Sequence, residues 1–351
     1  MKHALLAMVT GILAVFAPAV AAQPASHEIR FQGDGLELRG TLLLPEMAGG
    51  DRVPAVLLLA GSGPTDRDGN QPPILNTNLL RQVAERLAAD GIASLRYDKR
   101  ACRVYASSFP PLDEMGPFFA MDRFVADARG ALAWLRERPE IDASRVGVLG
   151  HSEGGVVALR VATEEPDSVA AAFLLATPGR PIAVLMREQF AAQLEASGVP
   201  DDSAGRALAK LDAAIAAAVA GEPFPENLPP AMRGLFNAST TVLTRDYAEI
   251  DPAALAAEVR CPVLILQGER DVQVLAEKDV DALATAVEAA GHGSFRVALL
   301  GDASHNFKRV ESDRDPGVAG PVLPDALGEI AEAAQDWLVR GSADGEEAGG
   351  R

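Results

Sequence analysis

The chain contains a serine whose neighbours suit nucleophilic catalysis. Ser152 lies in Gly150-His151-Ser152-Glu153-Gly154, between the apolar run "RVGVLG" and a helical pattern. A sharp strand-to-helix turn exposes a serine hydroxyl, and glycines two residues on either side remove the Cβ clashes that the turn would create. The alternative is an ordinary turn with a helix-capping serine. The flanking strand and helix favour the nucleophile, so we predict this role for Ser152.

A serine hydroxyl needs a base within hydrogen-bond reach to become an effective nucleophile. His305 follows the apolar run "FRVALLG", and loops at the carboxyl ends of parallel strands are where an open sheet gathers its ligand groups. His27 and His292 suit surface positions, and His151 is expected on the wall of the pocket. We therefore predict His305 as the base.

An imidazole base needs a carboxylate that fixes its tautomer and stabilises its cation. Asp271 ends "LILQGERD", in the loop that leaves the strand preceding His305. Glu269 and Asp302 are the alternatives, as acids of neighbouring loops. The order serine, aspartate, histidine favours Asp271.

A tetrahedral intermediate of acyl transfer needs two N–H donors for its oxyanion. We expect one from the backbone of Glu153 and the other from the glycine-containing loop "AGSGPTDRDGN", where we assign it to the backbone of Ser62, with Gly63 as the next choice. Arg67 in this loop is expected to form a structural ion pair rather than to contact a substrate acid.

The elements that position these residues follow from hydrophobic periodicity. Residues 27–46 alternate apolar and polar side chains around Gly33-Asp34-Gly35, which predicts an antiparallel hairpin. Short apolar runs predict parallel strands buried on both faces, and amphipathic patterns between them predict helices. The predicted strands are 54–61, 93–99, 145–150, 169–178, 262–268 and 295–301, and the predicted helices are 78–89, 122–138, 154–163, 277–290 and 325–340. Their alternation predicts an α/β fold with a doubly wound, mostly parallel sheet.

A long interruption separates the fourth and fifth predicted parallel strands, 169–178 and 262–268. Its Ala-rich runs predict several short helices, so we expect a helical cap inserted at about residues 181–256 of a domain that spans 23–340. Residues 341–351, "GSADGEEAGGR", are expected to form a solvated tail.

The N-terminus has the pattern of a secretory signal peptide, residues 1–22, with cleavage expected after Ala22 or Ala21. The alternative, a membrane anchor, needs roughly 20 apolar residues, and the run here is shorter. We expect an exported protein, periplasmic or secreted, without stable membrane insertion.

The formal net charge of −17 disfavours a nucleic-acid partner. The two cysteines, Cys102 and Cys261, are expected at opposite ends of their strands and therefore unpaired.

These motifs together resemble the α/β-hydrolase superfamily, and most of all its exported bacterial esterases with "GSGPxDRDG", "RYDKRG", "GHSxGG", "QGxxD" and "HNF". The resemblance runs from about Glu28 to Arg340 and is weak through the expected cap. It implies the α/β-hydrolase fold. One departure is Ala101, where relatives have glycine after "RYDKR".

The leading functional hypothesis is a serine hydrolase that cleaves small-molecule carboxylic esters through an acyl-serine intermediate, without metal or organic cofactor. The cap and residues 109–119 are expected to form an apolar wall, which predicts short to medium acyl chains. The alternatives are a serine aminopeptidase-like enzyme of the same fold, which needs a carboxylate for the substrate amine, and a non-catalytic binding protein. The acids that the expected cap offers for this purpose include Glu188, Glu195, Asp201, Asp202 and Glu226, although such acids more often form a solvated face.

Overall fold

The structure, a computed structural model, describes residues 24–46, 51–291, 294–312 and 314–341, except the side chains of residues 230–231. The predicted signal peptide at 1–22, and all but the first residue of the predicted tail, lie outside the described residues.

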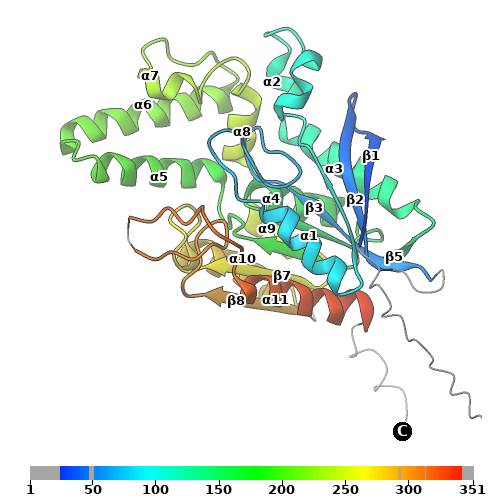
Figure 1. The fold of residues 1–351 in the computed structure, drawn as a ribbon. Coiled ribbons are helices and arrows are strands. Elements are labelled where there is room, and N and C mark those ends of the chain that lie inside the picture. The colour runs from blue at the N-terminus through cyan, green and yellow to red at the C-terminus, as the bar shows by residue number, and fades with distance from the viewer. Residues whose placement is uncertain (1–23, 47–50, 292–293, 313, 342–351) are drawn as a thin grey trace, which may run out of the picture.

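An eight-stranded sheet forms the centre of the protein, in the order β1-β2-β4-β3-β5-β6-β7-β8 (Figure 1). β1 pairs antiparallel with β2 and β2 antiparallel with β4, whereas the remaining pairs are parallel. The predicted hairpin is confirmed, with Gly35 at φ 71° in its turn. The strands are β1 (Ala25–Gln32), β2 (Glu37–Leu44), β3 (Val53–Leu59), β4 (Ala93–Tyr97), β5 (Ile141–His151), β6 (Ala172–Leu175), β7 (Val263–Gly268) and β8 (Phe295–Leu300).

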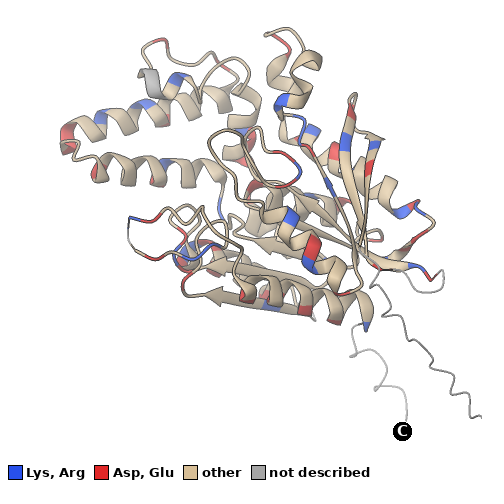
Figure 2. Ribbon diagram, in the orientation of Figure 1, with Lys and Arg blue, Asp and Glu red and all other residues tan. Residues whose placement is uncertain are grey.

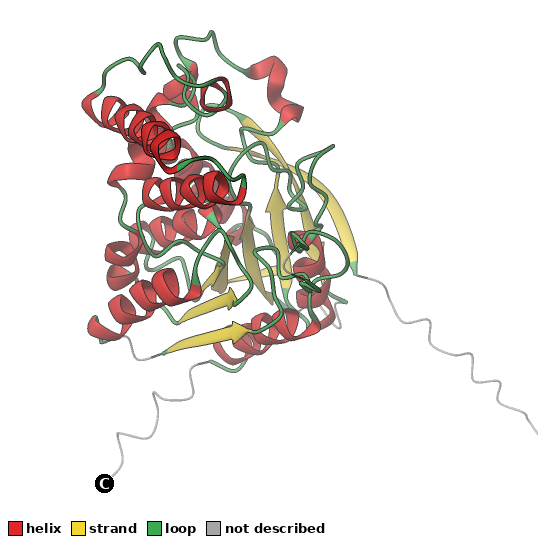
Figure 3. Cartoon of the chain, turned by 90° about the vertical axis from the view of Figure 1, so that its left-hand side faces the viewer, coloured by secondary structure: helices red, strands yellow, loops and turns green. Residues whose placement is uncertain are grey.

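Helices cover both faces of this sheet, which confirms the predicted doubly wound arrangement (Figure 3). Alternate residues of each central strand enter opposite cores: Leu57 packs with the helices α3, α4, α9 and α10, whereas Leu58 packs with α1 and α11. The bounds are α1 (Leu79–Ala89), α3 (Met121–Arg136), α4 (Glu153–Glu164), α9 (Pro252–Glu258), α10 (Asp281–Ala289) and α11 (Pro324–Ala334). Shorter helical segments are η1 (Arg103–Ser108), α2 (Met115–Phe118), η2 (Ala276–Val280) and η3 (Gln335–Val339).

The edge strand β8 departs from the prediction that all the apolar runs are buried on both faces. Phe295, Val297 and Leu299 are 36%, 38% and 48% exposed. Their neighbours along the strand are half-buried. β8 has one partner strand, β7, and its alternate side chains point away from the core. The prediction was wrong for this strand because an apolar run does not reveal which strand lies at the edge.

Four of the helices between β6 and β7 form the helical insertion, residues 182–249: α5 (Ile182–Ala196), α6 (Asp201–Ala220), α7 (Pro230–Arg233) and α8 (Thr241–Glu249). In Figure 1, α5 and α6 project from the body of the protein. The insertion has a small core of its own, which includes Leu211, Leu228 and Phe236. α9, by contrast, contributes Ala256 to the core beside the sheet.

Charged residues of both signs are interspersed over the ribbon rather than gathered in one basic stripe (Figure 2). Within the described ranges, none of the helices combines the length and the apolar character that a membrane crossing requires.

Candidate active site

Ser152 lies on the sharp turn between β5 and α4, with φ 56° and ψ −124°. This conformation is rare for a residue with a side chain and costs about 1–3 kcal/mol. Its N–H donates to the Leu175 carbonyl of the neighbouring strand, at 2.8 Å, which holds the turn against the sheet. A Cβ added at Gly150 would lie 2.0 Å from the Gly154 carbonyl oxygen, and one at Gly154 would lie 2.4 Å from the Leu59 carbonyl oxygen. The two glycines therefore allow the turn, as the motif predicted.

His305 lies in the loop after β8, and its Nδ1–H donates to Asp271 Oδ2 at 2.7 Å. Of the three predicted acids, Asp271 is therefore the one that contacts the imidazole. Glu269 is exposed, and Asp302 pairs with Arg309 at the surface. With Nδ1 occupied, the remaining ring nitrogen of His305, Nε2, is the one free to act as a base.

Asp271 is buried in the loop after β7 and is held by further donors. Its Oδ1 accepts from the backbone N–H groups of Gln273 at 2.7 Å and Val274 at 3.1 Å, and its Oδ2 accepts from Gln267 Nε2 at 2.9 Å. Burial by itself raises the pKa of Asp271, but His305 and these backbone donors outweigh it, so the pKa lies below the ordinary value. The carboxylate is therefore ionised and fixed. Gln267, in the "QG" of the motif, is a contributor that the sequence reasoning missed.

His151 lies beside the site, with its ring centre 4.8 Å from that of His305, and is not among the described residues that line the large cavity described below. Its Nε2–H donates to the His305 carbonyl at 2.8 Å, because a carbonyl oxygen can only accept. Burial, and then the neighbouring His305 ring, lower the pKa of His151 to about 3. A neutral, hydrogen-bonded His151 therefore supports the loop that carries His305.

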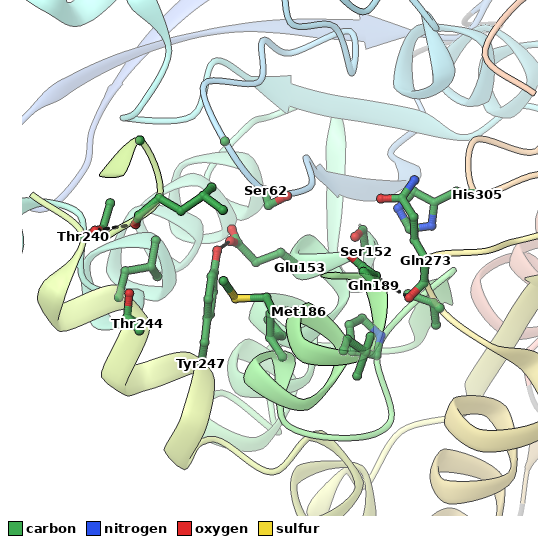
Figure 4. A pocket seen from close by; sticks show the side chains of 18 residues that line it. Ser62, Ser152, Glu153, Met186, Gln189, Thr240, Thr244, Tyr247, Gln273 and His305 are labelled. Atoms are coloured by element: carbon green, nitrogen blue, oxygen red, sulfur yellow. Dashed lines mark hydrogen bonds between the residues drawn. The ribbon is translucent and has the colours of Figure 1, made fainter. Parts of the chain in front are cut away.

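The loop after β3 brings Ser62 and Gly63 to the cavity wall opposite the turn at Ser152 (Figure 4). The Ser62 carbonyl accepts from Thr65 Oγ1 at 2.7 Å and Gln71 Nε2 at 2.8 Å. Because a peptide unit is planar, fixing this carbonyl also fixes the direction of the Gly63 N–H. Gly63 has φ 80°, which glycine adopts without strain. Glu153 is the first residue of α4, where backbone N–H groups lack intrahelical partners.

The Glu153 side chain belongs to a buried cluster that sequence reasoning did not find. Its carboxylate accepts from Lys99 Nζ, after β4, and from the Tyr247 hydroxyl, on α8 of the insertion. Burial, and then the carboxylate, raise the pKa of Tyr247 well above its ordinary value. The cluster therefore joins the turn at Ser152 to the helical insertion.

A cavity of about 350 Å³ opens between the turn at Ser152 and the insertion. Ser152 and His305 lie at one end of it, and Tyr247 and Met186 line the other part (Figure 4). Its apolar lining residues from the insertion are Ile182, Leu185, Met186, Leu235 and Leu243. None of the five predicted acids of the insertion is among the described lining residues.

The prediction that residues 109–119 contribute the apolar wall was wrong, because no residue of that segment lines the cavity. The rings of Phe109, Phe118 and Phe119 pack edge to face, with centroids 5.0–5.8 Å apart. Phe118 also lies under the Arg100 guanidinium, at 4.9 Å. These aromatic side chains therefore pack against one another and do not contribute to the cavity wall.

Other residues named from the sequence have structural roles. Arg67 pairs with Asp98 at 2.7 Å and with Glu28 at 2.6 Å, which confirms the expected ion pair. Ala101 does not have a positive φ, so the departure from glycine creates no backbone strain there. Both cysteines are unpaired, as predicted. Among the described residues, no group of three His, Cys, Asp or Glu side chains is placed to hold a metal ion.

Sequence comparisons find one matching family model and two curated relatives. A family model described as "Serine aminopeptidase, S33" matches residues 76–197. Esterase EstD from Thermotoga maritima is 28% identical over 308 residues, which are 86% of this chain and 66% of the relative. Polyketide transferase claH from Penicillium crustosum is 31% identical over 142 residues, which are 40% of each chain. The chain thus spans less than two thirds of the length of these curated relatives.

Solved structures share the fold at low sequence identity. An acylaminoacyl peptidase from Pyrococcus horikoshii superimposes with a TM-score of 0.59 at 16% identity, over 91% of this chain and 42% of that one. An esterase from Pyrococcus furiosus gives a TM-score of 0.57 at 15% identity, over 93% of this chain and 96% of that one. The sheet order, the turn at Ser152 and these solved structures agree, and the chain has the α/β-hydrolase fold.

Proposed function

We propose that the protein is a serine hydrolase that cleaves carboxylic esters with short to medium acyl chains. The observation that carries the proposal is one arrangement: Ser152 on a strained turn, at a cavity that also holds His305, whose Nδ1–H is bound by the buried Asp271. Esterase EstD, the relative that matches most of the chain, supports the ester class.

In the proposed reaction, Ser152 Oγ attacks the ester carbonyl carbon while His305 Nε2 takes the hydroxyl proton. Asp271 stabilises the resulting imidazolium, because its carboxylate is ionised and already bound to Nδ1–H. Collapse of the intermediate expels the alcohol, which receives the proton from His305. Water then repeats the sequence on the acyl-serine and releases the acid.

The negative charge of the intermediate develops on the former carbonyl oxygen. We assign its donors to the backbone N–H of Glu153 and to the loop at Ser62 and Gly63. Thr65 and Gln71 support the assignment, since their hydrogen bonds hold that loop in one orientation before substrate arrives.

The cavity supports an apolar acyl group of limited length. A buried methylene contributes about 0.8 kcal/mol, so catalytic efficiency should rise roughly fourfold per added carbon while space remains. A volume of about 350 Å³ is at the small end of ligand cavities, which favours short to medium chains over long ones.

The same cavity favours esters over peptides with a free amine. An aminopeptidase needs a carboxylate for the substrate ammonium group, and Glu153 is the only acid among the described lining residues. Lys99 and Tyr247 already occupy both of its oxygens. Of the predicted acids, Glu188 pairs instead with Arg180 and Lys278.

The test is a panel of p-nitrophenyl esters and aminoacyl-p-nitroanilides on the wild type and on Ser152→Ala, together with labelling by a fluorophosphonate. We expect Ser152-dependent labelling and a maximum at short to medium acyl esters. Undiminished labelling of Ser152→Ala would remove the proposed nucleophile.

A serine aminopeptidase-like activity is the second candidate, and the description of the matching family model favours it. Faster cleavage of an aminoacyl anilide than of the matching butyrate ester, lost in Ser152→Ala, would replace the esterase proposal. A non-catalytic binding protein is the third reading, and it requires that neither labelling nor turnover occurs.

We further propose that the protein is exported after cleavage near Ala22, that it uses no cofactor, and that its partner is a small-molecule ester rather than a nucleic acid. The N-terminal pattern supports export, and the formal charge of −17 supports a partner other than nucleic acid. N-terminal sequencing of the protein from the periplasmic and culture fractions tests the first. A mature chain that begins before residue 20 would contradict it.

A further inference from the structure

A second, smaller cavity of about 140 Å³ adjoins the proposed site. It shares Ser62, Ser152, Gln273 and His305 with the large cavity. In Figure 4, His305 and Gln273 lie on one side of Ser152, and Met186 and Tyr247 lie on the other. The small cavity adds His151 and Asn306, the residues that flank His305 in space and in sequence, whereas the large one continues under the insertion. Two spaces therefore extend from the same serine.

The lining of the small cavity is uncharged and mixes polar side chains with the apolar side chains of Leu75, Leu80 and Val318. Its described lining residues include Thr65, Gln71 and Asn306, and none is Asp, Glu, Lys or Arg. His151, also in the lining, is neutral because its pKa is lowered to about 3. This contrasts with the apolar side chains that the insertion contributes to the large cavity.

Asn306 is the most informative of these residues. It is only 6% exposed, yet among the described residues its side-chain amide makes no hydrogen bond. Its amide atoms are not among the fully buried polar atoms that lack a partner, so the amide is accessible from the cavity that Asn306 lines and can bind a molecule there. Gln71 donates to the Ser62 carbonyl and to Thr65, but its own amide oxygen accepts from none of the described groups. The cavity thus offers amide donors and acceptors that a hydroxyl-bearing molecule can satisfy.

The proposed reaction determines what belongs in each space. The Ser152 Oγ–acyl bond forms, the bond between the acyl carbon and the alcohol oxygen breaks, and the proton taken by His305 goes to that alcohol oxygen. His305 lines both cavities, but it lies on the side of Ser152 away from Met186 and Tyr247 (Figure 4). We therefore place the alcohol in the small cavity and the acyl chain in the apolar cavity.

We propose that the small cavity binds the alcohol portion of the ester, and that this alcohol is a small, neutral polyol of about the size of glycerol. The proposal rests on the proposed ester hydrolysis. A water molecule takes about 30 Å³ of liquid, so about 140 Å³ holds four or five groups of that size. That is the number of carbon and hydroxyl groups in a glyceryl moiety.

The test compares two esters with the same acyl chain and similarly shaped alcohols, glyceryl 1-monobutyrate and 2-methylbutyl butyrate. The second replaces each free hydroxyl by a methyl group. We expect kcat/KM for the glyceryl ester to be about tenfold higher in the wild type. Asn306→Leu should lower this ratio about threefold to tenfold, the range for one lost hydrogen bond. Because the two esters are compared on the same variant, any general damage to the site lowers both values of kcat/KM and leaves their ratio unchanged. Asn306→Ala replaces Asn306→Leu if the latter does not fold.

The matched control is Leu243→Trp, which fills the large cavity. It should shift the acyl-length preference towards shorter chains and leave the ratio of the two butyrates within about twofold of wild type. Equal use of both esters by the wild type, or a ratio that Asn306→Leu and Asn306→Ala do not change, would overturn the polyol proposal alone. A wild type that cleaves neither ester and resists the fluorophosphonate would overturn the proposed hydrolase as well.

Discussion

Replacing Lys99 with methionine should destabilise the folded protein by about 3–5 kcal/mol, because it leaves the Glu153 carboxylate buried without its cation. The side chains of Lys99 and Glu153 are only 8% and 2% exposed, so water cannot solvate the Glu153 carboxylate once the lysine is removed. Lys99 also donates to the Gly61 carbonyl at 3.2 Å and lies 4.1 Å from the Phe124 ring centre. Methionine keeps the contact with the ring, and the loss therefore falls mainly on the charge and its hydrogen bonds.

A double-mutant cycle separates the interaction energy between Lys99 and Glu153 from the other effects of each substitution. Glu153→Gln removes the negative charge and keeps an amide oxygen that can accept from Tyr247. Lys99→Met combined with Glu153→Gln removes both charges, so it should cost clearly less than the sum of the single changes. Tyr247→Phe removes one donor to a buried carboxylate and should cost about 1–3 kcal/mol.

Urea denaturation of the four proteins of the cycle measures these free energies. The matched control is Arg81→Met, which breaks the exposed Arg81–Glu85 pair one helical turn apart and should cost no more than about 0.5 kcal/mol. A cost below about 1 kcal/mol for Lys99→Met, or additive costs in the double mutant, would refute the view that the pair is a coupled buried unit.

The remaining predictions concern the acid, the pH dependence and the thiols. Asp271→Asn should lower kcat by up to about 10⁴ and keep the fold, because an amide favours the wrong imidazole tautomer. Asp302→Asn, which alters a surface pair, should cost far less in the same kinetic assay, and the opposite ranking would contradict the assignment. His151 has a folded pKa of about 3 against an ordinary 6.5, so the unfolded chain takes up its proton first and stability falls as the pH drops from about 6.5 towards 3. His151→Gln should weaken that acid-dependent loss in denaturation curves, and an unchanged loss would exclude His151 as its source. Burial raises the pKa of Cys102 and raises that of Cys261 to about 12, so a thiol reagent at neutral pH should react slowly with the native protein and should count two free thiols after unfolding. A count of zero without reductant would mean that they pair.

The features that the sequence determined by itself depend on residues close together along the chain. The alternating pattern around Gly35 specified the hairpin, and the apolar runs separated by amphipathic patterns specified an α/β sheet covered on both faces. The glycines around Ser152 indicated the sharp turn, because a Cβ at Gly150 would lie 2.0 Å from the Gly154 carbonyl oxygen, four residues along the chain. Hydrophobic period and steric exclusion act over a few residues, so the sequence shows them directly.

The tertiary structure alone decided which distant groups meet. Sequence order favoured Asp271 over Asp302, but contact with His305 depends on how the loops after β7 and β8 lie together. Tyr247 reaches Glu153 across 94 residues, and no local pattern marks it. Phe118 packs against Phe119 and Arg100 instead of lining the cavity, and hydrophobic periodicity does not show which partner a buried ring contacts. The physical reason is common to all three: burial and hydrogen bonding between remote segments depend on packing in three dimensions, and a local pattern records only that a side chain is apolar, polar or charged.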